Sequence, residues 1–497
     1  MNDLKSRLIR YMDAGFPILY LHTFEEDKAD KLIRSVASGR GILDWNIKGF
    51  FDHQDHISQP GQSLVETLNL LTSLNKSLDR KVLVLKDTYN FLDDPTIVAL
   101  LKNIALRINQ GLDECTIIIV SPMVKLPKDL ENFMTILTID HLSTEEIRQV
   151  IVSFCEEQKT TPLKEELREE LTVAFKGLSE FEIRNILALA LSENGEIAYA
   201  DLKLIFEQKQ QVIEKSGILE MIPLKESLED VGGLENLKKW LHRKERVFKN
   251  IDKAEAYGVD VPKGVLIAGM PGCGKSLNAK AAAHLFRVPL LRLDMGRLMG
   301  KYVGESEENM RKAISLAEAI SPCVLWIDEL EKAFAGIGGD GGGADITTRL
   351  FGTFLTWLQE KKSLAFVVAT ANNIEKMPPE LLRKGRFDEI FFVGLPNRKE
   401  REKIFEIHIK KRRKDDYSKI DIQALVAKTD GYSGADIEGV VKDSVEEAFY
   451  KEKSELTTED ILEAIKATHS LSEIMKDSLD KMSKMYKERK FKNASDM

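Results

Sequence analysis

A glycine-rich octapeptide between an apolar strand and a helix constrains this chain more than any other feature. The segment GMPGCGKS (269–276) follows the apolar run VLIA (265–268) and precedes the helical sequence LNAKAAAHLF. Glycines let backbone N–H groups turn inward around phosphate oxygens, and the start of the helix adds partial positive charge. This strand–loop–helix context makes a chance glycine-rich turn a poor alternative. The sequence therefore predicts a nucleoside triphosphate site formed by Pro271, Gly272, Cys273, Gly274, Lys275, Ser276 and Leu277.

Side chains in and beyond this loop supply the charges that a magnesium–nucleotide complex needs. We expect Lys275 to reach the β- and γ-phosphates and the Ser276 hydroxyl to ligate Mg²⁺. Further along, the apolar strand VLWI (324–327) ends in Asp328 and Glu329. Asp328 suits a second Mg²⁺ ligand, and Glu329 can polarise the attacking water. An acidic pair alone is more commonly a solvated turn, but downstream of a complete glycine-rich loop we interpret it as part of an ATP-hydrolysing site.

The order of apolar segments indicates that the same module is written twice. The matched pairs are PILYLHT (17–23) with VLIA (265–268), VLVLKD (82–87) with VLWIDE (324–329), TIIIVSP (116–122) with AFVVATA (365–371), MTILTIDHLSTEEIRQVI (134–151) with IFFVGLPNRKEREKIFEI (390–407), GLSEFEIRNILALAL (177–191) with GYSGADIEGVVKDSV (431–445), and EIAYADLKLIFEQ (196–208) with ELTTEDILEAIKA (455–467). Strands that alternate with helices predict an α/β fold, with parallel sheets covered on both faces.

The first copy of the module lacks the residues that hold a phosphate. After PILYLHT comes FEEDKAD (24–30), which has no glycine and several acids that would repel a triphosphate. At the second acidic position, Lys86 and Asp87 replace an Asp-Glu pair. We therefore expect the first copy to keep the fold without the site, and the chain to bind at most one nucleotide.

The repeat also gives domain boundaries. We expect a first module over 1–216 with its helical part from about His141, a connector over 217–229, an α/β domain over 230–395, a helical lid over 396–470, and a C-terminal helix and tail over 471–497. Apolar residues at helical spacing predict that the tail docks as a helix. The last residues, KNASDM (492–497), are expected to be frayed.

Composition excludes several classes of protein. No apolar run approaches the roughly 20 residues that span a bilayer, and the start, MNDLKSRLIRYMDAGF, lacks the apolar core of a signal peptide. A cytoplasmic protein is expected. The net charge of −8 disfavours nucleic acid as a partner, despite basic runs at 410–414 and 481–492. The four cysteines are far apart, which indicates neither a disulfide framework nor a zinc site.

From Asp230 onward the chain resembles the AAA family of hexameric ATPases, within the AAA+ superfamily. DVGG (230–233) is similar to the segment that wraps the adenine, and Asn372 to sensor 1, which orients the attacking water and the γ-phosphate. The resemblance implies a P-loop AAA+ domain with a helical lid, preceded by a degenerate AAA-like module with its own helical part. It adds these residues to the nucleotide site: Asp230, Gly232, His408, Gly434 and Ala435.

The same resemblance implies contacts outside the chain's own site. Arg383 and Arg386, in LLRKGRFDEI, match arginine fingers that reach the ATP of a neighbouring subunit. Lys301 and Tyr302 match a first pore loop that contacts a protein substrate, and the segment 336–345 falls at the second. A homo-oligomeric ring, a hexamer in this family, is therefore expected.

Each of these family matches has a simpler alternative. Asn372 alone would cap a turn, Arg383 and Arg386 would be surface cations, and His408 would be a packed core histidine. Tyr302 would rest on its own surface. Within the whole set of motifs we favour the functional interpretation.

Two departures separate this chain from the common family pattern. Where an Asp-Gly pair commonly follows the helix before sensor 1, this chain reads TWLQEKK (356–362), and its front module has no phosphate loop. The combination is most similar to the little-characterised AAA proteins of cyanobacteria and algal plastids. A plastid-encoded member would lie in the plastid stroma.

Three functions follow from these patterns, and they remain open at this point. The first is an ATP-driven ring that remodels or threads an unidentified protein substrate. The second is a nucleotide-gated regulator or scaffold that switches assembly without threading. The third, a nucleic-acid motor, has only the basic runs in its favour and is disfavoured by net charge.

Overall fold

The structure is a computed structural model, and it describes residues 2–23, 25–37, 39–53, 56–73, 78–139, 141–215, 217–298, 305–334, 343–383, 385–489 and 491–496. The chain divides into two units, Met1–Leu202 and Lys203–Met497, which we describe separately. Among the described residues, no helix is long and apolar enough to cross a membrane.

The first unit is built on a mostly parallel sheet. Its strands are β1 (Ile18–His22), β2 (Gly41–Asn46), β3 (Gly49–Asp52), β4 (Ile57–Pro60), β5 (Lys81–Lys86), β6 (Cys115–Ser121) and β7 (Met134–Thr138). They lie in the order β4-β3-β2-β5-β6-β1-β7, in which β3 and β4 extend one edge as antiparallel strands. Buried apolar residues alternate along β5, as expected for a sheet with a core on each face, because Val82 and Val84 belong to one core and Leu83 and Leu85 to the other.

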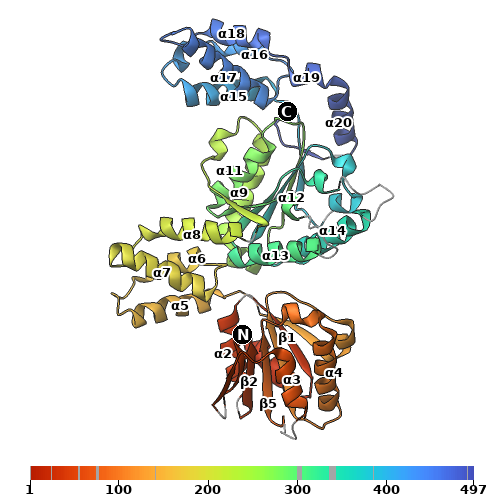
Figure 1. The fold of residues 1–497 in the computed structure, drawn as a ribbon. Coiled ribbons are helices and arrows are strands. Elements are labelled where there is room, and N and C mark those ends of the chain that lie inside the picture. Colours follow the sequence, from red (N-terminus) through yellow and green to blue (C-terminus); the bar gives the residue numbers. More distant parts are fainter. Residues whose placement is uncertain are drawn as a thin grey trace. The chain divides into compact units, whose positions relative to one another are not determined.

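Helices cover both faces of this first sheet. α1 and α2 supply the core on one face, and α3 and α4 supply it on the other (Figure 1). A separate helical part follows, in which capping boxes at Ser143 and Ser179 start α5 and α7. The helices are α1 (Asn2–Asp13), α2 (Glu26–Val36), α3 (Leu64–Ser73), α4 (Pro95–Asn109), α5 (Thr144–Glu157), α6 (Glu165–Ala174), α7 (Glu180–Asn194) and α8 (Asp201–Lys215), the last of which continues into the second unit, with the 3-10 helices η1 (Tyr89–Asp93) and η2 (Lys128–Phe133).

The second unit contains another mostly parallel sheet. Its strands are β8 (Leu219–Ile222), β9 (Gly264–Gly269), β10 (Leu290–Leu293), β11 (Cys323–Ile327), β12 (Ala365–Ala371), β13 (Glu389–Val393) and β14 (Lys492–Asn493). They lie in the order β14-β13-β9-β12-β11-β10-β8, with β8 antiparallel to β10. The segment 217–229, expected to be a connector, thus contains an edge strand whose Leu219 and Met221 are buried.

Helices of the second unit form two layers and a lid. α9 and α11 pack on one face of the sheet, α13 and α14 pack on the other, and the lid helices have a core of their own (Figure 1). The helices are α9 (Glu235–Lys249), α10 (Ile251–Ala256), α11 (Lys275–Phe286), α12 (Met295–Leu298), α13 (Glu305–Ile320), α14 (Gly343–Glu360), the lid helices α15 (Arg398–Arg412), α16 (Ile422–Ala427), α17 (Gly434–Tyr450) and α18 (Thr458–Ala467), and α19 (Leu471–Ile474) and α20 (Lys476–Glu488), with the 3-10 helices η3 (Leu228–Asp230), η4 (Leu330–Phe334), η5 (Ile374–Lys376), η6 (Pro379–Leu382) and η7 (Tyr417–Lys419).

The two sheets share one strand order, which confirms the repeat predicted from sequence. Strands in corresponding positions run β7-β1-β6-β5-β2 in the first unit and β13-β9-β12-β11-β10 in the second. The residues after β5 and β11 also share a backbone feature, because Asp87 and Glu329 have φ of 56° and 50°. Capping boxes recur as well, since Ser179 and Ser433 start the corresponding helices α7 and α17.

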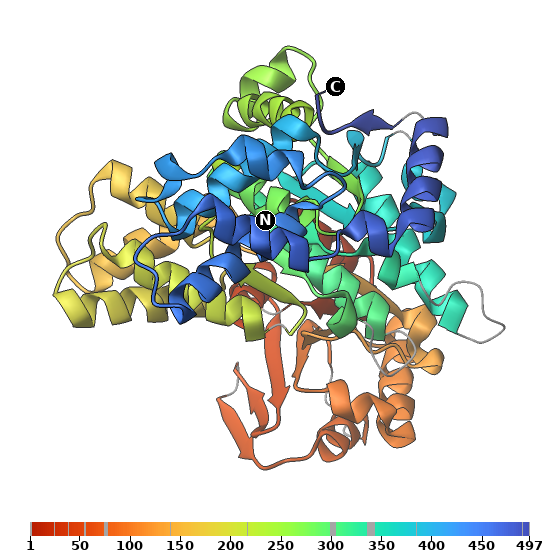
Figure 2. The same ribbon diagram turned by 90° about the horizontal axis from the view of Figure 1, so that it is seen from above.

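The C-terminal segment differs from the prediction in one respect. α20 docks as expected, with Leu479 and Tyr486 buried, and the Tyr486 ring stacks on Phe392 at 4.1 Å between centroids. Residues 492–496 are not frayed, however. β14, the dark blue arrow near the C-terminus in Figure 2, pairs with β13, and Ala494 is fully buried. The hydrogen-bonding groups of an open sheet edge account for this pairing, which the polar sequence of the segment does not reveal.

Candidate nucleotide-binding site

The glycine-rich loop joins the end of β9 to the start of α11, as predicted. Gly272 and Gly274 have φ of 69° and 81°, in the left-handed region that favours glycine. A Cβ on Gly272 would lie 2.9 Å from the Ser433 hydroxyl and 3.0 Å from the Ala435 methyl. The Ala435 N–H donates to the Gly272 carbonyl at 2.9 Å. Glycine here thus serves both the turn of the loop and the close approach of the lid.

Lys275 is the first residue of α11 and is almost completely buried. Its ammonium group donates to the carbonyls of Gly269 at 3.1 Å and Met270 at 2.6 Å. Burial lowers the pKa of the Lys275 amine, since charged groups are disfavoured away from water. The loop therefore folds around the lysine, and two of its backbone carbonyls hold the ammonium group.

Two hydroxyl groups converge on Asp328 at the end of β11. The Ser276 hydroxyl donates to Asp328 Oδ1 at 3.0 Å, and the Thr370 hydroxyl donates to the same oxygen. A hydroxyl beside a carboxylate is an oxygen donor set that fits Mg²⁺ bound together with phosphates. Sequence reasoning did not find Thr370, although its place near the end of the strand that pairs with β11 was a signal.

Glu329 is held next to the predicted sensor residue. Its N–H donates to the Thr370 hydroxyl at 3.1 Å, and its Oε1 accepts a hydrogen bond from Asn372 Nδ2 at 3.3 Å. Lys332 forms an ion pair with the same carboxylate. Backbone and side-chain contacts together fix the direction of the Glu329 side chain.

Glu331 is a buried carboxylate that sequence reasoning missed. One oxygen accepts the Asn372 N–H at 3.0 Å, and the other is buried with no hydrogen-bond partner among the described residues. Glu331 therefore fixes the backbone of Asn372 through this hydrogen bond. The sequence IDELEKA gives no signal that separates this glutamate from a surface residue.

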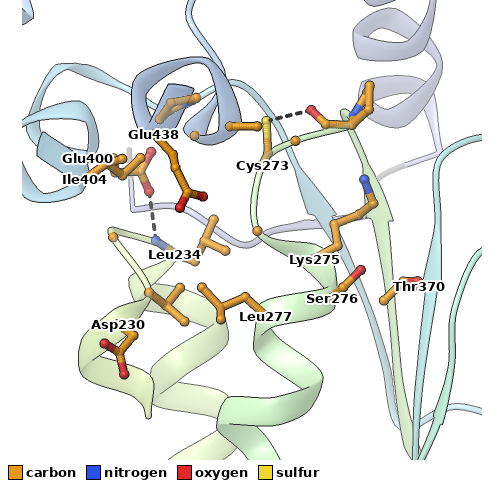
Figure 3. Close-up of a pocket in the computed structure, with 18 of the residues that line it drawn as sticks. Asp230, Leu234, Cys273, Lys275, Ser276, Leu277, Thr370, Glu400, Ile404 and Glu438 are labelled. Carbon is orange, nitrogen blue, oxygen red and sulfur yellow. Dashed lines mark hydrogen bonds between the residues drawn. The ribbon is translucent and has the colours of Figure 1, made fainter. Parts of the chain in front are cut away.

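The segment that follows Asp230 is pressed against lid helix α15. A Cβ on Gly232 would lie 2.4 Å from Ile404 Cγ1, and one on Gly233 would lie 2.4 Å from Glu400 Cγ. The Leu234 N–H donates to Glu400 Oε1 at 2.9 Å, a bond marked in Figure 3. The two glycines are thus needed for contact with the lid, and Glu400 was not foreseen.

A cavity of about 500 Å³ lies between the glycine-rich loop, the 230–234 segment and the lid. This volume is within the range of small-molecule sites, about 300–1,000 Å³. Figure 3 shows side chains from all three parts around it. The cavity brings together these predicted residues: Asp230, Gly232, Pro271, Gly272, Cys273, Gly274, Lys275, Ser276, Leu277, Asp328, Glu329, Asn372, His408, Gly434 and Ala435.

His408 lies at the lid side of the cavity. Burial lowers the pKa of its imidazole, although Glu438 lies 3.7 Å away and acts in the opposite direction. Arg412 lies 3.2 Å from His408 Nδ1, where a guanidinium can only donate. Burial and the neighbouring guanidinium both favour the neutral imidazole, in which Nδ1 can accept a hydrogen bond from Arg412.

Cys273 lines the cavity with an unreactive thiol. Burial raises the pKa of this thiol to about 11, and its Sγ donates to the Pro271 carbonyl at 3.5 Å. Because the thiolate is the nucleophilic form, Cys273 is a packing residue at neutral pH.

Among the described residues, two that were predicted to be functional, Arg383 and Arg386, do not line this cavity. Arg383 is exposed, and Arg386 has a buried Nη1 with no hydrogen-bond partner among the described residues. Lys301 and Tyr302 lie outside the described residues, as do residues 336–342 of the second predicted pore loop.

The corresponding place in the first unit carries charges of the opposite sign. Lys86 stands where Asp328 stands in the second unit, and its ammonium pairs with Asp30 at 2.7 Å and Glu26 at 3.3 Å. Glu25 is buried, which raises the pKa of its carboxyl to about 7, and it accepts the Glu180 N–H at the start of α7. In the first unit, internal ion pairs thus occupy the place that the glycine-rich loop and Lys275 occupy in the second unit.

Comparison with known proteins covers both units. Residues 265–395 match the family described as "ATPase family associated with various cellular activities (AAA)", and residues 419–463 match the AAA+ lid domain. In the first half, residues 4–139 and 145–216 match the N-terminal and second domains of SpoVK-like AAA ATPases.

Several curated relatives match over most of their length. An uncharacterized AAA domain-containing protein, ycf46, of Guillardia theta is 41% identical over 464 residues, which cover 92% of this chain and 89% of the relative. The protein of the same name from Pyropia yezoensis is 37% identical over 97% of this chain and 98% of the relative. A cell division cycle protein 48 homolog of Archaeoglobus fulgidus is 36% identical over 220 residues, which cover 44% of this chain and 30% of that protein. This chain therefore belongs to the AAA family of ATPases, in the group of AAA domain-containing proteins known from algal plastids.

Proposed function

We propose that this chain hydrolyses ATP at one Mg²⁺-dependent site and works in a homo-oligomeric ring, a hexamer, that remodels or threads protein substrates. The convergence of one buried lysine, a hydroxyl–carboxylate pair and a glutamate–asparagine pair on a single cavity supports it most. The front unit, with its internal ion pairs, binds no nucleotide. The protein lies in the cytoplasm, or in the plastid stroma where it is plastid-encoded, which the algal relatives support.

Each side chain has a task in hydrolysis. The Lys275 ammonium exchanges its two carbonyl partners for phosphate oxygens. Ser276 and Asp328 would hold Mg²⁺, which neutralises charge on the phosphates. Glu329 takes a proton from the attacking water, and the Asn372 amide keeps that carboxylate in position.

Glu329→Gln is expected to bind ATP normally and to hydrolyse it about 10²–10⁴ times more slowly, because only the proton acceptor is lost. Single-turnover hydrolysis and equilibrium binding of labelled ATP measure the two effects. Glu375→Gln, at an exposed glutamate outside the cavity, is the matched control and should behave as wild type. Wild-type turnover in Glu329→Gln would mean that another group is the base.

The ring is supported by the two arginines that the cavity leaves out. Arg383 and Arg386 do not line their own chain's site, and a buried nitrogen of Arg386 has no hydrogen-bond partner among the described residues. Arg383 is exposed and Arg386 is partly exposed, so their guanidinium groups can donate to the phosphates of a neighbouring subunit.

A second candidate, a nucleotide-gated regulator or scaffold without threading, is favoured by the front unit. There Lys86 and its acidic partners stand in place of a nucleotide site. In this candidate function, the front unit serves assembly or partner binding.

Tyr302 separates the two candidates. In the Glu329→Gln background, ATP-dependent capture of proteins should be lost in Tyr302→Ala if the ring grips substrates at this loop, while ATP binding stays unchanged. Tyr257→Ala, at a tyrosine that is 89% exposed elsewhere in the second unit, is the control. Capture that survives Tyr302→Ala would favour the scaffold.

A further inference from the structure

The segment that carries Arg386 is tied to the strand of the phosphate loop. Residues 385–388 have no regular secondary structure and lie between η6 and β13. The Asp388 N–H donates to the Gly264 carbonyl at 2.9 Å, and Phe387 is buried. These contacts fix the end of the segment next to β13. They do not involve the Gly385–Arg386 peptide.

Lys263 contacts the Gly385–Arg386 peptide. Its ammonium donates to the Gly385 carbonyl at 2.7 Å and to the Gln359 carbonyl, in the last turn of α14, at 2.6 Å. The Lys263 backbone is itself fixed, because its N–H donates to Asp388 Oδ2 at 3.2 Å and its carbonyl accepts the Val367 N–H at 3.0 Å. One side chain thus joins α14, the loop before Arg386 and the first residue of β9.

We propose that Lys263 is a positioning residue for Arg386, and that it sets the geometry with which Arg386 reaches the nucleotide of a neighbouring subunit. This inference rests on the proposed ring function. An ammonium group has three donors and forms charge-assisted hydrogen bonds, so it can hold two carbonyls at once. Without it, the Gly385 peptide has no such anchor and Arg386 shifts from its working position.

The same contact links α14 to the arginine segment. α14 begins at Gly343, within the segment 336–345 that is expected to form the second pore loop, and the Gln359 carbonyl in its last turn accepts a hydrogen bond from the Lys263 ammonium. A displacement of α14 is therefore transmitted to Gly385 and Arg386 through one side chain.

Lys263→Met is the first test, made in the full-length chain. It keeps the apolar stem and removes the donors, and we expect kcat to fall about tenfold to a hundredfold, as for a misplacement of about 1 Å. The Kd for ATP should stay within about threefold of wild type, because Lys263 is not in the cavity, and Lys263→Arg should recover most of the turnover by donating to the same carbonyls. An unchanged kcat in Lys263→Met, or an equal loss in Lys263→Arg, would overturn the inference.

Lys361→Met is the matched control. The Lys361 ammonium also donates to two carbonyls nearby, those of Pro262 at 3.0 Å and Ser363 at 3.1 Å, but to none in the arginine segment. The turnover of Lys361→Met should stay near that of wild type. If it falls as far as that of Lys263→Met, then general loosening of this region explains both losses and the inference fails. Should Lys263→Met not be recovered as a folded protein, Lys263→Gln replaces it, since it keeps part of the stem and a shorter donor.

Mixing experiments show whether Lys263 acts through Arg386. Lys275→Ala subunits have a defective phosphate loop and an intact Lys263–Arg386 pair. Mixing them with Lys263→Met subunits should restore hydrolysis, because the intact arginine serves the Lys263→Met site across the interface. In an Arg386→Ala background, Lys263→Met should cause no further loss.

These outcomes distinguish the inference from the function on which it rests. If Arg386→Ala is rescued by mixing and Lys263→Met is not, Lys263 acts within its own subunit through β9 and only the inference is wrong. If neither is rescued although the subunits co-assemble, the proposed arginine finger is wrong, and the inference fails with it. Additive losses in the double variant would also overturn the inference.

Discussion

Lys275→Ala is expected to remove ATP binding from the whole chain. The substitution takes away the one cation of the glycine-rich loop, and truncating one partner of a buried charge pair costs about 2–5 kcal/mol, or roughly 30-fold to 5,000-fold in affinity. We expect no compensation from the front unit, since its corresponding segment has Glu25 and Glu26 in place of glycines. Equilibrium binding of labelled ATP to the full-length chain measures the effect.

Lys280→Ala is the control for this experiment. Lys280 lies on the same helix, α11, outside the cavity, and pairs with Glu226 at 3.0 Å. Its removal should leave ATP affinity within about threefold of wild type, as expected for a surface ion pair. An affinity of Lys275→Ala that matches this control would contradict the assignment of the site.

Arg386→Ala should lower turnover by about 10³–10⁵ while ATP binds almost as tightly as before. An arginine finger neutralises charge that spreads over the transferring phosphoryl group, so its removal acts on the transition state and leaves the bound substrate nearly unaffected. Measuring kcat and the Kd for ATP separately tests both parts. Arg383→Ala is made alongside to show which of the two arginines carries the larger effect.

Mixed assemblies decide whether Arg386 acts across an interface. Lys275→Ala subunits cannot bind ATP but retain Arg386, whereas Arg386→Ala subunits bind ATP but lack the finger. Hydrolysis should return on mixing, although neither variant hydrolyses ATP alone. If co-assembled subunits stay inactive, the arginine is structural, and the proposed ring loses its main support.

The sequence revealed those parts of the fold that local patterns encode. Apolar runs placed the strands, and the order of six matched segments anticipated that both sheets share one strand order. The site was equally readable where a motif is continuous, as in Lys275 and Ser276, because the spacing of a loop that cradles phosphates is fixed by the backbone. Asp328 followed from its place after an apolar strand, and Asn372 followed from the resemblance to the AAA family.

What the sequence did not reveal depends on pairings between distant segments. Thr370 contacts Asp328, and Glu331 contacts Asn372, only because their elements are neighbours in the folded unit. The edge strand β14 is a polar dipeptide with no pattern of its own, and the vacant edge of β13 orders it. Lys263 reads as an ordinary surface lysine until the two carbonyls that it joins are known.

The reversed charges of the front unit make it difficult to convert this unit into a nucleotide site by single substitutions. Asp30, Glu26 and Asp44 all act on the Lys86 ammonium, so an acid at position 86 alone would place a fourth carboxylate among these three and remove the lysine that they share. Removing the acids first would leave a largely buried lysine without partners. Either order passes through a destabilised intermediate. Conversion of this half into a nucleotide site would therefore require several of its charged residues to change together.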